Sequence, residues 1–126
     1  AVKYAQVRQT FGKPIIKHEA IAFKLADMDI QTEVGRSSII NFLNKYYDER
    51  KNGRYNYSRE AAICKCFCGD MCVQVALDAI QILGGFGYSR EYPVEKLVRD
   101  AKIMQIYEGT NEVQRIVISG QITKKH

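Results

Sequence analysis

The sequence contains no tryptophan and only two prolines among its 126 residues. It nowhere holds a run of about 18 consecutive apolar residues, so we expect no membrane-spanning helix. The opening residues, AVKYAQVRQ, show neither the apolar core of a signal peptide nor the Arg/Ser-rich pattern of a transit peptide. Because these residues lack an initiator Met and open as if inside a helix, we expect a mature or excised fragment without its targeting information.

Runs of charge of one sign are also scarce along the chain. The net charge is +5, from 19 Lys and Arg against 14 Asp and Glu, but the basic residues are scattered and usually stand beside acids. Such a surplus could serve a phosphate-bearing ligand, a nucleic acid or a membrane surface. The scatter favours a general basic surface, and we expect no nucleic-acid partner.

All four cysteines lie in the segment CKCFCGDMC, between Cys64 and Cys72. Cys64, Cys68 and Cys72 are spaced along one face of a helix, whereas Cys66 points to another face. A helix cannot bring all four thiolates to one tetrahedral metal ion. The spacing therefore predicts reduced cysteines at helix contacts and no metal site.

The longest periodic pattern predicts a helix from about Lys17 to Arg50, ending at the polar segment KNGRYN. Ala1 to Gln9 is expected to be the tail of a preceding helix, and TFGKP a turn. The apolar stripe of the long helix comprises Ile21, Leu25, Met28, Thr32, Gly35, Ile39, Phe42 and Tyr46.

A second long helix is expected from a Ser58 cap to Leu83, with a stop at Gly84-Gly85. Asp70 falls between core positions of this helix, where a charged group needs a partner. The predicted core face comprises Ile63, Cys66, Phe67, Val73, Leu77 and Ile80.

Two shorter helices complete the pattern. Pro93 suits the first turn of one, and Thr110 can cap the other. Their predicted inner faces comprise Val94, Leu97, Val98 and Ala101, then Val113, Ile116, Val117 and Gly120. No segment is typical of a strand. The prediction is an all-α, antiparallel up-and-down helical bundle with one long hairpin.

One carboxylate stands at the break between the last two helices, in QIYEGTNEVQR. Glu108 there can be aimed by irregular backbone, and the N–H groups around Gly109 and Thr110 could bind a carbonyl or phosphate oxygen. A base beside such N–H groups suits proton abstraction next to a carbonyl. Most glutamates between helices are simply solvated, so this pattern alone does not distinguish a catalytic Glu108 from a solvated one.

Two further motifs suit a cofactor. In QILGGFGY, Gln81 to Tyr88, paired glycines permit close backbone approach and the Gln81 amide can hydrogen-bond a polar edge. In RQTFGKP, Arg8, Thr10 and exposed backbone could bind a pyrophosphate, while Phe11 could pack on a ring. Each could equally be a turn between helices.

Taken together, R-x-T-FGKP, QILGGFGYSREYPVEKLVRDAKI and QIYEGTNEVQR, in this order, resemble the acyl-CoA dehydrogenase family. The resemblance covers residues 1–126 and corresponds to the C-terminal helical domain, with its first helix truncated. The segments YPVEKLVRDAKI and YEGT are most similar to medium-chain members. The resemblance implies that the N-terminal helical and middle β-domains are absent and that this fragment alone is inactive.

The resemblance also implies residue roles. Glu108 matches the base that removes the α-proton of an acyl-CoA, while FAD takes the β-hydride to give a trans-2-enoyl-CoA. Glu108 and Gly109 would contact the substrate. Further positions match those that bind FAD, the first two groups of them on a neighbouring subunit: Arg8, Thr10 and Phe11; Gln81, Ile82, Leu83, Gly84 and Gly85; and Gly109, Thr110 and Glu112.

The family further implies a dimer of dimers, with electron-transferring flavoprotein as the usual acceptor. Its members act in β-oxidation, in the mitochondrial matrix of eukaryotes or otherwise in the cytoplasm. Glu112 stands where several relatives have Gln, and no substrate contact carries over between Asn52 and Arg59. Two other readings stay open: a short- or branched-chain relative, and a non-catalytic helical oligomerisation or interaction module of the same fold.

Overall fold

The computed structural model describes residues 1–51, 53 and 56–123. Its elements are α1 (Val2–Val7), β1 (Gln9–Thr10), β2 (Lys13–Pro14), the 3-10 turn η1 (Ile15–Lys17), α2 (Glu19–Arg50), α3 (Ser58–Leu83), α4 (Gly85–Tyr88), α5 (Val94–Ile103) and α6 (Asn111–Thr123).

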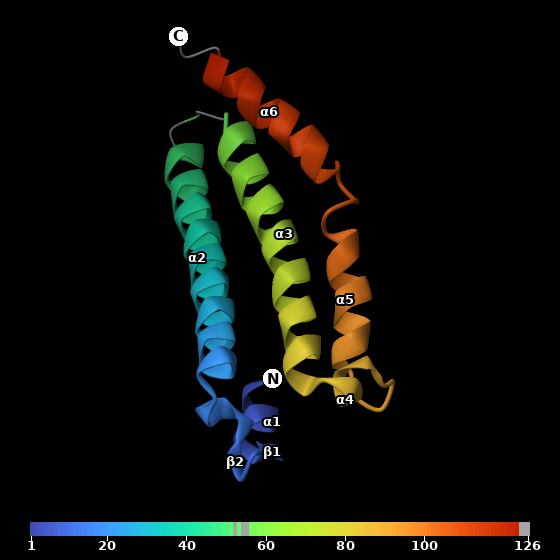
Figure 1. Ribbon diagram of the computed structural model, residues 1–126. Coiled ribbons are helices and arrows are strands. Elements are labelled where there is room, and N and C mark those ends of the chain that lie inside the picture. The colour runs from blue at the N-terminus through green and yellow to red at the C-terminus, as the bar shows by residue number, and fades with distance from the viewer. Residues whose placement is uncertain (52, 54–55, 124–126) are drawn as a thin grey trace.

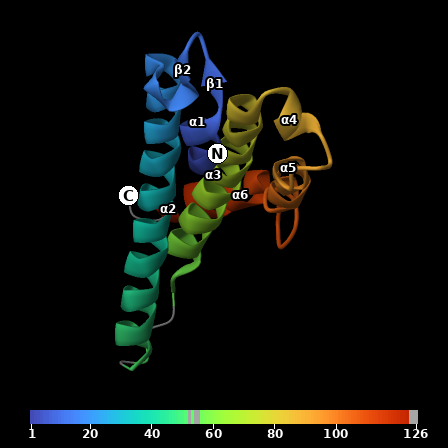
Figure 2. The same ribbon diagram turned by 90° about the horizontal axis from the view of Figure 1, so that it is seen from below.

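The two long helices, α2 and α3, run antiparallel side by side, and α5 returns along α3 (Figure 1). Helix α6 does not continue the line of α5 but turns across α3 (Figure 2). The all-α, antiparallel bundle with one long hairpin is therefore confirmed, and α3 is its central element, because α2, α5 and α6 all pack against it.

The helix ends follow the predictions with small shifts. Helix α2 begins at Glu19 because Ile15–Lys17 forms a 3-10 turn, and it ends at Arg50 as expected. The predicted Ser58 cap is wrong: Tyr57 is the N-cap, and Ser58 is the first helical residue. Pro93 stands just before α5 rather than inside its first turn. Thr110 does cap α6, since its Oγ1 accepts a hydrogen bond from the Val113 N–H at 3.3 Å.

The expectation that no segment forms a strand is also wrong, in one small place. Helix α1 stops at Val7, and β1 pairs antiparallel with β2 across the tip at Phe11 and Gly12. Both tip residues have positive φ, 50° and 75°, as a tight two-residue hairpin requires. Strands of two residues are too short to show a period, so the pattern could not indicate them.

The buried core gathers where α1, η1, α3 and α5 meet, around Ala5, Ile15, Ile82, Leu83 and Val94. Elsewhere the helices leave apolar side chains uncovered. Several positions predicted to lie inside are exposed: Ile39, Phe67, Leu77, Leu97, Val113 and Ile116. Helical periodicity identifies an apolar stripe but not the element that covers it.

The cysteines lie at helix contacts, on different sides of α3. Cys64 Sγ is 3.2 Å from Ser38 Oγ and Cys68 Sγ is 3.9 Å from the Gly35 carbonyl oxygen, both on α2. Cys66 Sγ instead lies 3.9 Å from the Asn111 carbonyl oxygen on α6. Burial raises the pKa of the Cys68 thiol, and the neighbouring cysteines add to this, so it stays protonated.

By length and composition alone, α3 could cross a membrane, because it holds an 18-residue window with a mean hydropathy of 1.5. Only 28% of that window is buried within the described residues. The core helix of a bundle passes the same test, and α3 carries Asp70 in a polar network between its neighbours. We therefore interpret α3 as the central helix of the bundle.

Gly87 offers a test of the tight turn after α3. A Cβ at this position would lie 2.6 Å from the Ile80 carbonyl oxygen and 2.9 Å from Leu83 Cβ. Gly87→Ala should therefore destabilise the protein by about 1–3 kcal/mol through overpacking. Gly120→Ala is the matched control, because a Cβ there meets nothing within 4 Å inside a helix. Gly120→Ala should raise the free energy of unfolding by about 0.5–1 kcal/mol. Thermal unfolding of the two full-length variants measures both effects. A Gly87→Ala protein that is as stable as the wild type would show that the turn tolerates a side chain.

Candidate functional site

The break between α5 and α6 holds Glu108 in a conformation that few residues adopt. Glu108 has φ 53° and Gly109 has φ 86°, both in the left-handed region. For a residue other than glycine this costs of order 1–3 kcal/mol and persists only where the surroundings enforce it. The carboxylate is exposed and finds no hydrogen-bond partner within the described part of the chain. Its direction therefore follows from the backbone that carries it.

The backbone around Glu108 presents donors rather than acceptors. Gln114 Nε2 donates to the carbonyl oxygens of Glu108, at 3.3 Å, and of Gly109, at 3.1 Å. Across residues 1–51, 53 and 56–123, no group accepts a hydrogen bond from the N–H groups of residues 108–110. Successive free N–H groups in left-handed backbone form a concavity suited to an oxyanion.

A small, mainly apolar cavity of about 290 Å³ lies between α3 and this break, with Glu108 at its edge. Its other lining residues are Lys65, Cys68, Gly69, Cys72, Met104 and Tyr107. The Tyr107 hydroxyl donates to Met104 Sδ at 2.9 Å, so its polar end is occupied locally. The carboxylate thus has room for an apolar ligand on one side.

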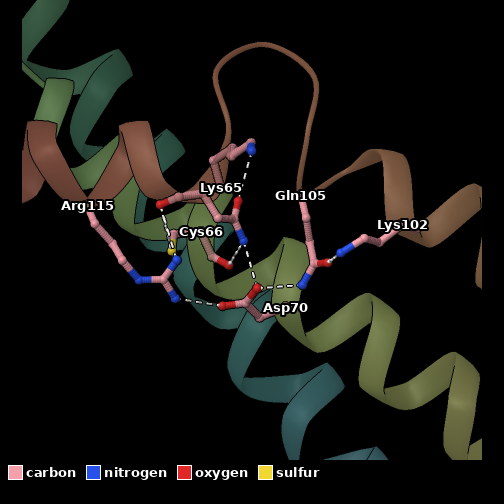
Figure 3. Close-up of polar contacts among 7 residues, drawn as sticks. Lys65, Cys66, Asp70, Lys102, Gln105 and Arg115 are labelled. Atoms are coloured by element: carbon pink, nitrogen blue, oxygen red, sulfur yellow. Dashed lines mark hydrogen bonds and ion pairs between the residues drawn. The ribbon is translucent and has the colours of Figure 1, made fainter.

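Beneath the break, Asp70 on α3 gathers a polar network (Figure 3). Its Oδ1 accepts hydrogen bonds from Gln105 Nε2 at 2.7 Å and Asn111 Nδ2 at 2.8 Å, and its Oδ2 pairs with Arg115 at 3.0 Å. The prediction that Asp70 needs a partner is confirmed. Sequence spacing could not identify these partners, since they lie on another helix and in the break.

The network keeps the Asp70 carboxylate ionised. Partial burial by itself would raise the pKa of Asp70, but the hydrogen bonds from Gln105, Asn111 and Arg115 and the Arg115 charge hold it below its ordinary value. Nearby, hydrogen bonds from its own backbone N–H and from the Thr110 side chain lower the pKa of Glu112. Both carboxylates thus stay charged near neutral pH.

A second site lies at the end of the molecule where the hairpin meets α4. A groove of about 690 Å³ brings together two of the predicted motifs, which are far apart in the sequence. Its lining includes Arg8, Thr10, Phe11, Ile82, Leu83, Gly84 and Gly85. Gln81, also predicted, is exposed and does not line it. Tyr4, His18 and Phe86 line it as well and were not predicted.

The chemistry of this groove suits a ligand with both phosphates and a ring. The Arg8 guanidinium lies 5.9 Å from the centre of the Phe86 ring, which keeps its charge at the groove. Phe11 is 97% exposed at the hairpin tip, edge-on to His18, whose Nε2 lies 3.0 Å from Thr10 Oγ1. A Cβ built on Gly84 or Gly85 would meet nothing within 4 Å, so a ligand can approach their backbone.

The groove and Glu108 do not meet within one chain. The groove lies beside α1, β1, β2 and α4, whereas Glu108 lies in the break between α5 and α6 (Figure 1), and the two cavities share no residue. The fold and sites therefore define a helical domain in which the Glu108 carboxylate and the ligand groove lie at separate places.

Comparison with known proteins identifies this domain. Residues 1–123 match the family described as acyl-CoA dehydrogenase, C-terminal domain, and the chain belongs to that family. It is 48% identical over 119 residues to an acyl-CoA dehydrogenase of Bacillus subtilis, covering 94% of this chain and 30% of the relative. It is 41% identical over 125 residues to the caffeyl-CoA reductase-Etf complex subunit CarC of Acetobacterium woodii, covering 99% of this chain and 32% of that protein.

Among solved structures, butyryl-CoA dehydrogenase from Megasphaera elsdenii superposes with a TM-score of 0.84 at 46% identity. The match covers 97% of this chain and 30% of that one. The chain thus spans about 30% of the length of the relatives that it matches.

Proposed function

We propose that this chain is the C-terminal domain of an FAD-dependent acyl-CoA dehydrogenase, in which Glu108 removes the α-proton of an acyl-CoA thioester. The product would be the trans-2-enoyl-CoA. The observation that carries the proposal is the left-handed Glu108, whose carboxylate borders a mainly apolar cavity and has no partner in the described part of the chain. Family membership supports the class of reaction, and the strained backbone of Glu108 supports this residue as the base.

The chain's own groups can perform the proton transfer. The thioester carbonyl makes the neighbouring α-hydrogen acidic, provided that the developing enolate oxygen is stabilised. The N–H groups of Glu108 and Gly109, which have no acceptor among the described residues, can supply that stabilisation. The Glu108 carboxylate, which has no hydrogen-bond partner among the described residues, can accept the proton as a general base. The mainly apolar cavity that Glu108 borders would hold an apolar part of the substrate.

The groove residues fit FAD. Arg8 offers a fixed cation for a phosphate, Phe11 an exposed ring, and Gly84 and Gly85 open backbone. Bound FAD would supply the acceptor for the β-hydride. We further propose cofactor contacts from Gln81, Gly109, Thr110 and Glu112, as the resemblance implies. Because the groove lies away from Glu108 in one chain, its ligand would belong to a second copy's active site.

A shared site requires a homo-oligomer, and we propose the dimer of dimers that the resemblance implies. The uncovered apolar side chains of α2, such as Phe23, Ile30 and Val34, support burial against further protein. Electron-transferring flavoprotein is the proposed electron acceptor, supported by a relative named as part of an Etf complex. The compartment would be the cytoplasm of a bacterium or the mitochondrial matrix of a eukaryote.

The length of the acyl chain needs its own proposal. The resemblance suggested a medium-chain enzyme, but a relative of known structure is a butyryl-CoA dehydrogenase. We therefore propose a straight-chain substrate, with short chains as the first to test.

Purified full-length protein tests the function. It should be yellow with bound FAD, and anaerobic addition of an acyl-CoA should bleach the flavin. Comparing butyryl-CoA, octanoyl-CoA and palmitoyl-CoA would rank the chain lengths. A colourless protein, or a flavin that no acyl-CoA bleaches, would instead support a non-catalytic helical module of the same fold.

A further inference from the structure

We propose that Asp70 is the positioning residue for Glu108. One oxygen of its carboxylate, on α3, accepts hydrogen bonds from both ends of the break, Gln105 and Asn111, and thereby fixes the position of the base. This inference rests on the proposed function, because it assigns a role within the same site. Asp70 itself touches neither the Glu108 side chain nor the cavity that Glu108 borders.

Asp70 lies where the two ends of the break come together. Gln105 precedes Glu108 and Asn111 follows it, and both donate to the same Oδ1 atom, at 2.7 and 2.8 Å. The Asn111 N–H also donates to the Gln105 carbonyl oxygen at 2.9 Å, which closes residues 106–110 into a loop. Asp70 Oδ2 holds Arg115, one turn into α6, at 3.0 Å. The start of α6 is thus fixed relative to the end of the α5 segment.

Two lysines set the orientation of the amides that contact Asp70. Lys102 Nζ donates to Gln105 Oε1 at 2.7 Å, and Lys65 Nζ donates to Asn111 Oδ1 at 2.8 Å. Each amide must therefore turn its NH₂ group toward Asp70, as Figure 3 shows for Gln105. Only an acceptor fits at that point. The network has one consistent arrangement of donors and acceptors, which favours a single loop conformation.

The loop also lies directly against α3. A Cβ at Gly69, the residue before Asp70, would lie 3.2 Å from the Met104 carbonyl oxygen and 3.3 Å from Asn111 Nδ2. Asn111 is 2% exposed. By contrast, the hydrogen bonds to the Glu108 peptide itself come only from Gln114 within the described residues. Gln114 thus holds the Glu108 peptide directly, whereas Asp70 holds the two residues that flank the loop, Gln105 and Asn111.

Asp70→Asn should disturb this arrangement while keeping the shape of the side chain. An amide has one acceptor oxygen, so its NH₂ group must face either Arg115 or the donors of Gln105 and Asn111. Asp78→Asn is the matched control. Asp78 is also on α3, and its carboxylate is likewise held by one cationic side chain and an amide, Lys24 at 2.6 Å and Gln74 at 3.0 Å. None of its hydrogen bonds within the described residues goes to the break.

The test uses the full-length, FAD-loaded enzyme and measures flavin reduction by saturating acyl-CoA, substrate affinity and FAD content. Asp70→Asn should slow flavin reduction about 10- to 100-fold, the effect of a small misplacement of a reacting group. Asp78→Asn should reduce its flavin at the wild-type rate. Substrate affinity and FAD content are measured for both variants, so that the rates are compared for FAD-loaded enzyme at saturating substrate. In a Glu108→Gln background, Asp70→Asn should cause no further slowing, because the two residues act as one unit.

Two results would overturn the inference: Asp70→Asn as fast as Asp78→Asn, or the same slowing with and without Glu108. The proposed function fails separately, if Glu108→Gln alone leaves flavin reduction fast. Should Asp70→Asn not load FAD, Gln105→Met serves instead. It removes one of the two bonds to Oδ1, and its slowing should likewise vanish in the Glu108→Gln background.

Discussion

The full-length enzyme carrying Glu108→Gln is expected to bind FAD and acyl-CoA but to reduce its flavin at least ~10²-fold more slowly than the wild type. This is the lower end of what a general base contributes. Gln keeps nearly the same shape as Glu but has no basic site at neutral pH. The positive φ of Glu108 should be kept, because the bonds that hold the break come from Asp70 and Gln114.

Stopped-flow bleaching of the flavin at saturating acyl-CoA measures this effect directly. Glu33→Gln is the matched control: the same change at an exposed residue of α2 far from the break, where Glu33 pairs with Arg36 one turn away at 3.2 Å. It should leave the rate unchanged. A Glu108→Gln enzyme that reduced its flavin within a few-fold of the wild type would show that the base lies elsewhere.

The local sequence pattern was sufficient to predict the helices of this domain and most of their ends. Spacing of apolar residues gave the extent of α2 and α3 within a few residues, because both helices are long and the periodic pattern repeats over many turns. Gly84 ended α3 as predicted, at φ 61°, and Thr110 capped α6. The break at Glu108 was visible for the same reason: a carboxylate and a glycine interrupted two helical patterns.

Features that depend on contacts between distant segments could not be read in this way. The charge of Asp70 predicted a partner, but the three donors come from positions 35 to 45 residues away in sequence. The groove that joins Arg8 to Gly84 and Gly85 likewise required the folded chain, as did the places of His18 and Phe86 in it. Exposure of Leu77 and Ile116 shows the same limit, since a stripe does not reveal what covers it.

Asn111→Leu should weaken the attachment of α6 more than any surface change in this domain. Asn111 is 2% exposed and makes three side-chain hydrogen bonds: to the Cys66 carbonyl oxygen at 3.1 Å, to Asp70 at 2.8 Å and from Lys65 at 2.8 Å. Leu has a similar branched shape but no polar atoms, so the Cys66 carbonyl oxygen and the partly exposed Asp70 and Lys65 side chains lose these bonds. Each buried polar group left unpaired costs about 1–3 kcal/mol.

We expect a total loss of about 3 kcal/mol, which is roughly a 10²-fold increase in local opening of α6. Hydrogen–deuterium exchange of the full-length protein would show it as faster exchange in α6 and in residues 104–110. Asn44→Leu, the same change at an exposed position of α2, should leave those amides within about 0.5 kcal/mol of the wild type. Unchanged protection of α6 in Asn111→Leu would mean that apolar packing on α3, and not the Asp70 network, holds this helix in place. In that case the Glu108 loop would have to be fixed by Gln114 and the α6 backbone alone.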